Sequence, residues 1–283
     1  VSPLSPAENS DLREEVSNKV SNNISMEGHS FAGADLSGLN LRGSNLAGVD
    51  FTSADLSGAD LTGAIATQAC FAHTTLKSTD FSSCDLSEAN FGSSKIENAK
   101  FLFATLDEAV FKNTVVANSI FLNAFFEKTV FDGATFIKPK FLLGDFTEAI
   151  FKECSIVEGD FSNCKLEKTT FLVSEIVAAS FLEAAGDRLS FIDSNIERSD
   201  FRLANLSKVS THENVKANYT DFRRANLTES NLRGSSMKYA DFSDAKIDKC
   251  DFSETDLYGA KFARVLGPSS RFQRANLDHV DFT

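Results

Sequence analysis

One spacing constrains this chain more than any other feature: an apolar residue recurs every five positions. The recurrence runs almost unbroken from Phe31 to Leu206. A period of five fits neither the 3.6-residue turn of an amphipathic helix nor the two-residue alternation of a flat strand. Self-similarity at a fixed period is typical of stacked repeats. We therefore expect a repeat architecture instead of an ordinary globular domain.

Phenylalanine adds a longer period. Phe71, Phe81, Phe91, Phe101 and Phe111 occupy every second repeat, and the chain has 27 Phe but only 3 Tyr and no Trp. If four five-residue sides make one coil, residues twenty apart lie above one another, and Phe stacks on Phe along two opposite walls. A small residue stands two positions before many of the apolar ones and leaves room in a narrow interior: Ala34, Ala54, Ala59, Cys84, Ala89 and Ala104.

Two segments carry the whole unit, Ala-Asp-Leu-Ser-Gly at 34–38 and Ala-Asp-Leu-Thr-Gly at 59–63. They resemble the pentapeptide-repeat family, whose consensus is a small residue, Asp or Asn, Leu or Phe, a polar residue and Gly. The resemblance covers about nine-tenths of the chain. It implies an all-β fold, a right-handed quadrilateral β-helix, over residues 31–283.

Residues 1–30 lie outside the repeat. Leu12, Val16, Val20 and Ile24 are spaced by four behind Ser10 and Asp11, which predicts a short amphipathic helix with an N-cap at that point. Solenoid ends need a cap, so we expect this helix to cover the first coil. A helix that binds a partner is the alternative.

The frame slips by one residue between Leu206 and Phe222. Thr211 and Lys216 fall on inward positions that should be apolar, so we expect a loop or a distorted coil at 207–221. Inward positions also fail at Ala66, Gly186 and Gly267, and the segments around the two glycines look like turns. Tolerated defects and functional interruptions are both open readings.

Nothing in the sequence assembles an active site, a cofactor site or a metal site. Cys84, Cys154, Cys164 and Cys250 sit at the small inward position, which favours packing over chemistry, and only Cys70 should face outward. The four His share no stacking register. Nucleotide-binding and nucleophile motifs are missing. We expect a protein that is not an enzyme and needs no cofactor.

The middle of the chain places apolar residues where the repeat is normally polar and exposed. Leu102, Leu122 and Leu142 each follow an inward Phe at twenty-residue spacing and predict an apolar ladder on one wall, with Phe103 and Leu143 beside it. Val110, Val130 and Ile150 predict a shorter ladder on the opposite wall. An exposed apolar stripe marks an interaction surface, although covering by neighbouring turns is the alternative.

These features favour a rod-like scaffold or adaptor for an unknown protein partner. The alternative follows from resemblance to quinolone-resistance pentapeptide proteins that engage DNA gyrase: an acidic mimic of double-stranded DNA that acts on a topoisomerase. Residues 1–110 hold 15 acidic and 6 basic residues (net −9), whereas 201–283 hold 11 and 13 (net +2). The total of −12 argues against direct nucleic-acid binding. The fading of charge towards the C-terminus argues against mimicry.

Three further expectations concern surroundings and assembly. No apolar run approaches the ~20 residues of a membrane span, so we expect a soluble protein without membrane contact. The start at Val1 is consistent with removal of a targeting segment, and the cytoplasm or a plastid, in its stroma or thylakoid lumen, is favoured. The repeats run to Phe282 without a cap, so we expect a homodimer through the C-terminal coil.

Overall fold

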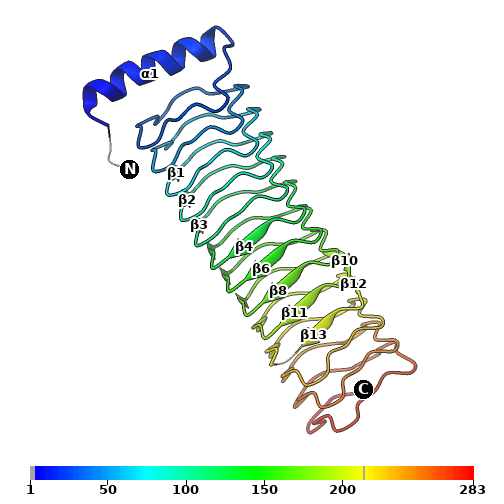
Figure 1. Ribbon diagram of the computed structural model, residues 1–283. Coiled ribbons are helices and arrows are strands. Elements are labelled where there is room, and N and C mark those ends of the chain that lie inside the picture. Colours follow the sequence, from blue (N-terminus) through cyan, green and yellow to red (C-terminus); the bar gives the residue numbers. More distant parts are fainter. Residues whose placement is uncertain (1–3, 213) are drawn as a thin grey trace. The chain divides into compact units, whose positions relative to one another are not determined.

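The computed structural model describes residues 4–212 and 214–283 as a parallel β-solenoid with a helix at its N-terminal side (Figure 1). Two compact units make up the chain: the first unit is Val1–Lys140 and the second unit is Phe141–Thr283. The predicted pentapeptide-repeat β-helix is confirmed. Within the described ranges, no helix combines the length and the apolar character that a bilayer crossing requires.

Short strands, each of three residues, alternate with turns. The first unit holds α1 (Pro6–Ser21), β1 (Thr75–Lys77), β2 (Lys95–Glu97), β3 (Val115–Ala117), β4 (Val130–Asp132) and β5 (Thr135–Ile137). The second unit holds β6 (Ile150–Lys152), β7 (Ser155–Val157), β8 (Thr170–Leu172), β9 (Glu175–Val177), β10 (Ala185–Asp187), β11 (Ser190–Ile192), β12 (Asn205–Ser207) and β13 (Ser210–His212).

Backbone hydrogen bonds join each coil to the next in strict register. Leu76 of β1 pairs with Ile96 of β2, and Ile96 pairs with Val116 of β3, always in parallel. The inward residue donates to a carbonyl nineteen positions later, as in Phe31 N to Asp50 O at 2.7 Å. Parallel pairing at a spacing of twenty means that four five-residue sides complete one coil.

Stacked phenylalanines fill the interior on two walls. The Phe91 and Phe111 rings lie 4.8 Å apart and nearly parallel, and so do the rings of Phe81 and Phe101. Between the two walls the rings meet edge to face, as for Phe91 and Phe101 at 6.1 Å and 74°. Both geometries are favourable for aromatic pairs, so one residue type supplies the packing along the coil axis and across it.

The small inward positions are buried, as predicted for the four cysteines. Cys84, Cys154, Cys164 and Cys250 are at most 2% exposed, and none of the five cysteines forms a disulfide. Cys84 Sγ donates to the carbonyl of Leu61 at 2.8 Å. Burial raises the pKa of Cys84 to about 12, and the pKa of Cys250 to about 12. These thiols are therefore packing residues.

The N-terminal helix begins earlier than the sequence predicts. Its N-cap is Ser5, whose side chain accepts from Glu8 N while the Glu8 carboxylate accepts from Ser5 N, and Pro6 follows. This reciprocal capping box outweighs the predicted cap at Ser10 and Asp11. Only Val16 of the helix is buried, and Ile24 lies beyond its end and is exposed.

Side chains of α1 complete the backbone hydrogen bonds of the first coil. In the next coil Asp55 N donates to the carbonyl of Ala34. No coil precedes the one that contains Asp35, so Asp35 N donates instead to Asn9 Oδ1, at 2.8 Å. Arg13 donates to the carbonyls of Asp35 and Ser37 at 3.1 and 2.8 Å. These contacts cover backbone groups at the open edge of the first coil.

Two predicted irregularities take a different form in the structure. Lys216 is exposed, and Ala217 points inward in its place, so one extra residue lies between the inward Thr211 and the next inward position. Gly186 lies within β10 and not in a turn, and a Cβ there would come within 2.7 Å of the Leu166 backbone. Leu189, at a position of the repeat that is normally small, is fully buried.

Asp and Asn side chains before the inward residues cap the turns. Asp35 Oδ1, Asp50 Oδ1 and Asp251 Oδ1 each accept from the backbone N–H two residues on, at 2.9–3.0 Å. Hydrogen bonds from the side chains of Ser37, Thr52 and Ser253 hold the pKa of these three carboxyls below the usual value. The charged form of the carboxylate therefore stabilises the fold.

Truncation of a stacked ring should be severely destabilising. Phe111 is fully buried and lies 4.8 Å from Phe91 and 5.1 Å from Phe131, so Phe111→Ala removes two ring contacts and leaves a cavity. We expect a loss of about 3–5 kcal/mol in the free energy of unfolding, measured by denaturant melts. A loss below about 1 kcal/mol would contradict the stacked core.

Acid should weaken the fold through the turn carboxylates. Because their pKa is lower in the folded state than in the unfolded chain, their contribution is complete above the unfolded value and disappears as pH falls through the folded value. We expect the melting temperature to fall between about pH 5 and pH 3. Combining Asp35→Asn, Asp50→Asn and Asp251→Asn keeps the amide oxygens as acceptors and should flatten this decline; an unchanged acid profile would be inconsistent with it.

Candidate interaction surfaces

Two residues of the predicted leucine ladder, Leu102 and Leu122, lie in the first unit within a larger apolar surface. Leu102 and Leu122 occupy equivalent positions on consecutive coils, joined by the hydrogen bond from Phe103 N to Leu122 O at 2.9 Å. Phe103 is 57% exposed. Ile120 precedes the inward Phe121 on the same wall, and Phe125 lies just past the next corner with 48% of its surface exposed. We call Leu102, Phe103, Ile120, Leu122 and Phe125 the leucine patch.

Two members of the leucine patch escaped the sequence analysis. Ile120 and Phe125 stand where the repeat normally has Asp or Asn, directly before an inward residue. An apolar residue at that position was the available signal, because the position is outward in each coil. Lys100 and Lys140 flank Ile120 through the backbone bridges on either side. The patch is therefore apolar in its middle with charged residues beside it.

The remaining predicted surface residues divide between the units. Val110 is 37% exposed and pairs with the half-buried Val130 in the first unit. Leu142, Leu143 and Ile150 belong to the second unit; Leu142 is half-buried, whereas Leu143 and Ile150 are exposed. Each of these side chains reaches the surface of its own unit.

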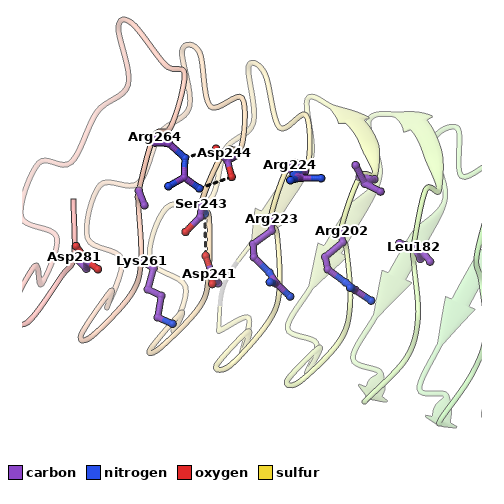
Figure 2. Close-up of a pocket in the computed structure, with 12 residues that line it drawn as sticks. Leu182, Arg202, Arg223, Arg224, Asp241, Ser243, Asp244, Lys261, Arg264 and Asp281 are labelled. Atoms are coloured by element: carbon purple, nitrogen blue, oxygen red, sulfur yellow. Dashed lines mark hydrogen bonds and ion pairs between the residues drawn. The ribbon is translucent and has the colours of Figure 1, made fainter. Parts of the chain in front are cut away.

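A groove of about 580 Å³ runs along one wall of the second unit, and Figure 2 shows the residues that line it. The wall is the one whose inward residues are Phe181, Phe201, Phe222, Phe242 and Phe262. Arg202 and Arg223 extend in the same direction from neighbouring coils (Figure 2). Leu182 and Leu203 lie at one end of the groove. The sequence analysis did not single out this surface, which we call the arginine groove.

Ion pairs hold most of the guanidinium groups of the groove in place. Arg202 binds Asp200 through Nε and Nη2, with 2.6 Å for the Nη2 contact, and Arg223 binds Asp221 in the same way. The hydrogen bond to Asp200 raises the pKa of Arg202. Arg264 makes two contacts of 2.8 Å with Asp244. Arg224 makes no ion pair among the described residues.

The described residues offer little for catalysis or metal binding. In the ranges 4–212 and 214–283, no group of three or more His, Cys, Asp or Glu is placed to hold a metal ion. Cys70 is half-buried, with its Sγ 3.3 Å from the Thr52 hydroxyl. What the geometry offers is surface: the leucine patch and the arginine groove.

Comparison with solved structures returns other repeat proteins. A trypsin-treated form of QnrB1, a plasmid-mediated fluoroquinolone resistance protein, is 16% identical over 69% of this chain and 91% of its own, with a TM-score of 0.37. HetL, involved in heterocyst differentiation regulation in the cyanobacterium Nostoc sp. strain PCC 7120, is 21% identical over 86% of this chain and 88% of its own, with a TM-score of 0.26. A pentapeptide repeat protein from the Arabidopsis thaliana thylakoid lumen is 24% identical over 41% of this chain and 66% of its own, with a TM-score of 0.23.

No curated protein matches the chain. The family model for pentapeptide repeats matches in eight copies, over residues 30–71, 74–113, 213–244, 235–266 and 247–283, which together are more than half of the sequence. Proteins of this kind are generally structural or binding proteins, and no enzyme family matches. The chain belongs to the pentapeptide-repeat family.

Proposed function

We propose that this protein is a non-catalytic scaffold that binds a partner protein through the leucine patch. The observation that carries the proposal is that outward positions hold large apolar residues: Leu102, Ile120 and Leu122 are half-buried at the surface, and Phe103 and Phe125 are exposed. Phe101 and Phe121 already fill the interior behind the patch and are at most 1% exposed. The outward Phe103 and Phe125 leave about half of their surface in water. Large apolar side chains that lie at the surface and do not pack in the core are typical of a protein–protein interface.

Backbone strain at Phe103 strengthens this argument. Phe103 has φ +57°, in the left-handed region that a bulky L-residue enters only at a cost of about 1–2 kcal/mol. The same corner of other coils in the first unit carries Gly43, Gly63, Ser83 and Asn123, all of them smaller than Phe, and Gly and Asn adopt this conformation easily. A strained and exposed Phe lowers stability, so its presence points to a function.

The partner should present an apolar protein surface. Buried apolar and aromatic side chains form the centre of protein interfaces, and charged groups form the rim. Lys100 and Lys140 lie beside Ile120 and suit such a rim. Lys100 Nζ forms an ion pair with Asp80 Oδ2 at 3.4 Å. Nucleic acid is a poor candidate for this patch, because phosphate binding needs clustered cations and not leucines.

Three narrower proposals stand beside this one. Mimicry of double-stranded DNA has the acidic first 110 residues in its favour, and inhibition of a topoisomerase supercoiling assay tests it. A homodimer through the C-terminal coil has the exposed Leu277 and Phe282 in its favour, and light scattering tests it. A location in the cytoplasm or a plastid is a proposal that fractionation of the source cells tests.

Charge placed within the leucine patch should abolish partner binding without unfolding the protein. Leu102→Asp combined with Leu122→Asp puts two carboxylates at surface positions on which the inward hydrogen bonds do not depend. We expect an unchanged circular dichroism spectrum and loss of the partners captured from an extract by the intact protein. Ser82 holds the equivalent position one coil earlier, so Ser82→Asp is the matched control and should retain capture. Unfolding of the double variant would place these leucines in the core and end the proposal.

Replacement of the strained Phe103 by Asn should raise the stability of the protein and weaken its binding to the partner. Asn123 shows that this corner accepts Asn at φ +53°. We therefore expect Phe103→Asn to raise the free energy of unfolding by about 0.5–1 kcal/mol, because Asn tolerates the left-handed region. The same variant should weaken partner capture. A variant that is less stable than the natural protein would show that Phe103 supports the fold.

A further inference from the structure

All three tyrosines of the chain gather at one surface of the second unit. The rings of Tyr219 and Tyr239 stack at 5.1 Å with an interplanar angle of 11°, and Tyr258 meets Tyr239 edge to face at 5.6 Å. His279 continues the row at 5.0 Å from Tyr258. Tyr219 is 55% exposed and Tyr239 is 45% exposed. We call Tyr219, Tyr239 and Tyr258 the tyrosine ladder.

The tyrosine ladder is maintained against backbone preference. Tyr219 and Tyr239 have φ +59° and +58°, so both occupy corners that favour Gly or Asn. The corner of the following coil carries Gly259, where a Cβ would lie 2.7 Å from two atoms of the Tyr239 ring. Gly259 therefore leaves the space that the Tyr239 ring occupies. Most corners of the chain carry a residue other than Gly at positive φ, so what distinguishes these corners is the stacking of the two rings and the glycine that leaves room for one of them.

The ladder displays the electropositive parts of its rings. An aromatic face is electronegative and its edge electropositive. Since Tyr219 and Tyr239 stack on each other, their facing sides are covered, whereas the ring edges and hydroxyl groups remain available to a ligand. This arrangement favours hydrogen-bond acceptors and anions over cations, which prefer an open ring face.

Two arginines of the adjoining arginine groove extend beyond the carboxylates that bind them, while Asp241 and the exposed Asp281 also line the groove. Tyr239 stands two residues before Asp241, which lines the groove. The side chains of Arg202 and Arg223 are 44% and 48% exposed, whereas their partners Asp200 and Asp221 are 27% and 25% exposed. The carboxylates are recessed and orient the guanidinium groups, so a ligand that approaches the wall meets N–H donors first.

Arg224 supplies a charge that no ion pair holds among the described residues, although Asp244 on the next coil lies near enough to interact with it electrostatically. It lies exposed at the corner after Arg223 and makes no ion pair among the described residues, while Arg264, at the same corner two coils on, is held by Asp244. Tyr and Arg are the residues most enriched at the energetic centres of protein interfaces. Leu182 and Leu203 add apolar surface at one end.

We propose that the arginine groove and the tyrosine ladder together bind an extended acidic segment of a partner protein. Four coil steps separate the rows of Leu182 and Ala263, which at ~4.8 Å a step is about 19 Å. An extended chain covers that length with about six residues. Carboxylates of the segment bind Arg224 and the free N–H groups of Arg202 and Arg223, and its apolar side chains lie on Leu182 and Leu203.

Single-stranded nucleic acid fits this surface less well. Sequence-tolerant binding of single strands needs open aromatic faces on which bases stack, and the stacked pair Tyr219 and Tyr239 leaves no gap for a base. A phosphate chain carries one negative charge per nucleotide and needs an excess of cations, whereas a segment that alternates acidic and apolar residues needs only the N–H donors of Arg202, Arg223 and Arg224 and the apolar surface of Leu182 and Leu203. The surface is independent of the leucine patch, which lies in the first unit, so either can fail without the other.

Fluorescence anisotropy on the full chain tests the proposal. The probe is a rhodamine-labelled hexapeptide of alternating Glu and Leu, in about 0.1 M salt, where charges more than about 10 Å away are screened. We expect binding that weakens with added salt, and little binding of the same peptide with Gln or Lys in place of Glu. Equal binding of the Gln peptide, tighter binding of a hexathymidylate, or no binding of the Glu peptide would overturn the proposal.

Matched variants locate the binding. Arg224→Gln should weaken the Glu peptide about three- to fivefold, and addition of Arg223→Gln should bring the loss to about tenfold or more. Arg224→Lys should restore most of the affinity, and Tyr239→Asn should weaken binding with unchanged or higher melting temperature. Arg188→Gln removes one positive charge at another exposed corner of the second unit and should leave the affinity for the Glu peptide unchanged. If Arg188→Gln weakens binding as much as Arg224→Gln, the attraction is unspecific; if Leu102→Asp with Leu122→Asp abolishes it, the peptide binds the leucine patch instead.

Discussion

The hydrogen bonds between successive coils are the constraint on which every other feature depends. Each inward residue donates to the next coil, as Phe91 N does to Val110 O at 2.8 Å, and the outward residue before it donates back to the previous coil, as Asn90 N does to Ala69 O. This pairing at twenty-residue spacing determines which residues face the core, which face water and which form the corners. A shift of the pairing by one residue would exchange those roles, so the stacked Phe rings and the buried small residues together stabilise the register.

The corners of the coils accept many residue types, and the backbone at the corners is strained wherever the residue is not Gly or Asn. Among the described residues, every side of a coil ends in a residue with positive φ, and Gly43, Gly58 and Gly63 meet that need in the early coils without strain. Later coils place Phe103, Val173 or Tyr239 in the same conformation, at a cost in stability that their exposed side chains do not offset. A corner occupied by a bulky residue is thus a more specific sign of function in this fold than exposure alone, because isolated exposed apolar residues are common on any protein.

The repeat itself could be predicted almost completely from the sequence, because the five-residue period and the Phe spacing report directly on backbone pairing. The outward character of Leu102 and Phe103 followed from the same frame. The helix start was wrong, since the capping box of Ser5 and Glu8 was overlooked, and Lys216 was placed inward, since the position of the single extra residue before Ala217 cannot be read from a run of polar residues. The arginine groove was missed for a related reason: Arg202 and Arg223 lie twenty-one residues apart, and only a frame corrected for that extra residue brings them together. Tyr219 and Tyr239 lie twenty residues apart, both after the extra residue, so the plain twenty-residue spacing, applied to the corner residues, predicts their stacking.

Charge and aromatic character together explain why one chain of a single repeat can offer two chemically different surfaces. The inward positions are restricted to apolar and small residues, so selection for binding acts almost entirely on the outward and corner positions, which contribute little to the core. In the first unit those positions became apolar around Leu102 and Leu122, whereas in the second unit they became guanidinium groups set above recessed carboxylates. The same Asp position serves both purposes: it caps the turn through Oδ1, as Asp221 does for Arg223 N at 3.0 Å, and its other contacts orient the arginine side chain. A residue that the repeat requires for folding thereby also arranges the surface that a ligand meets.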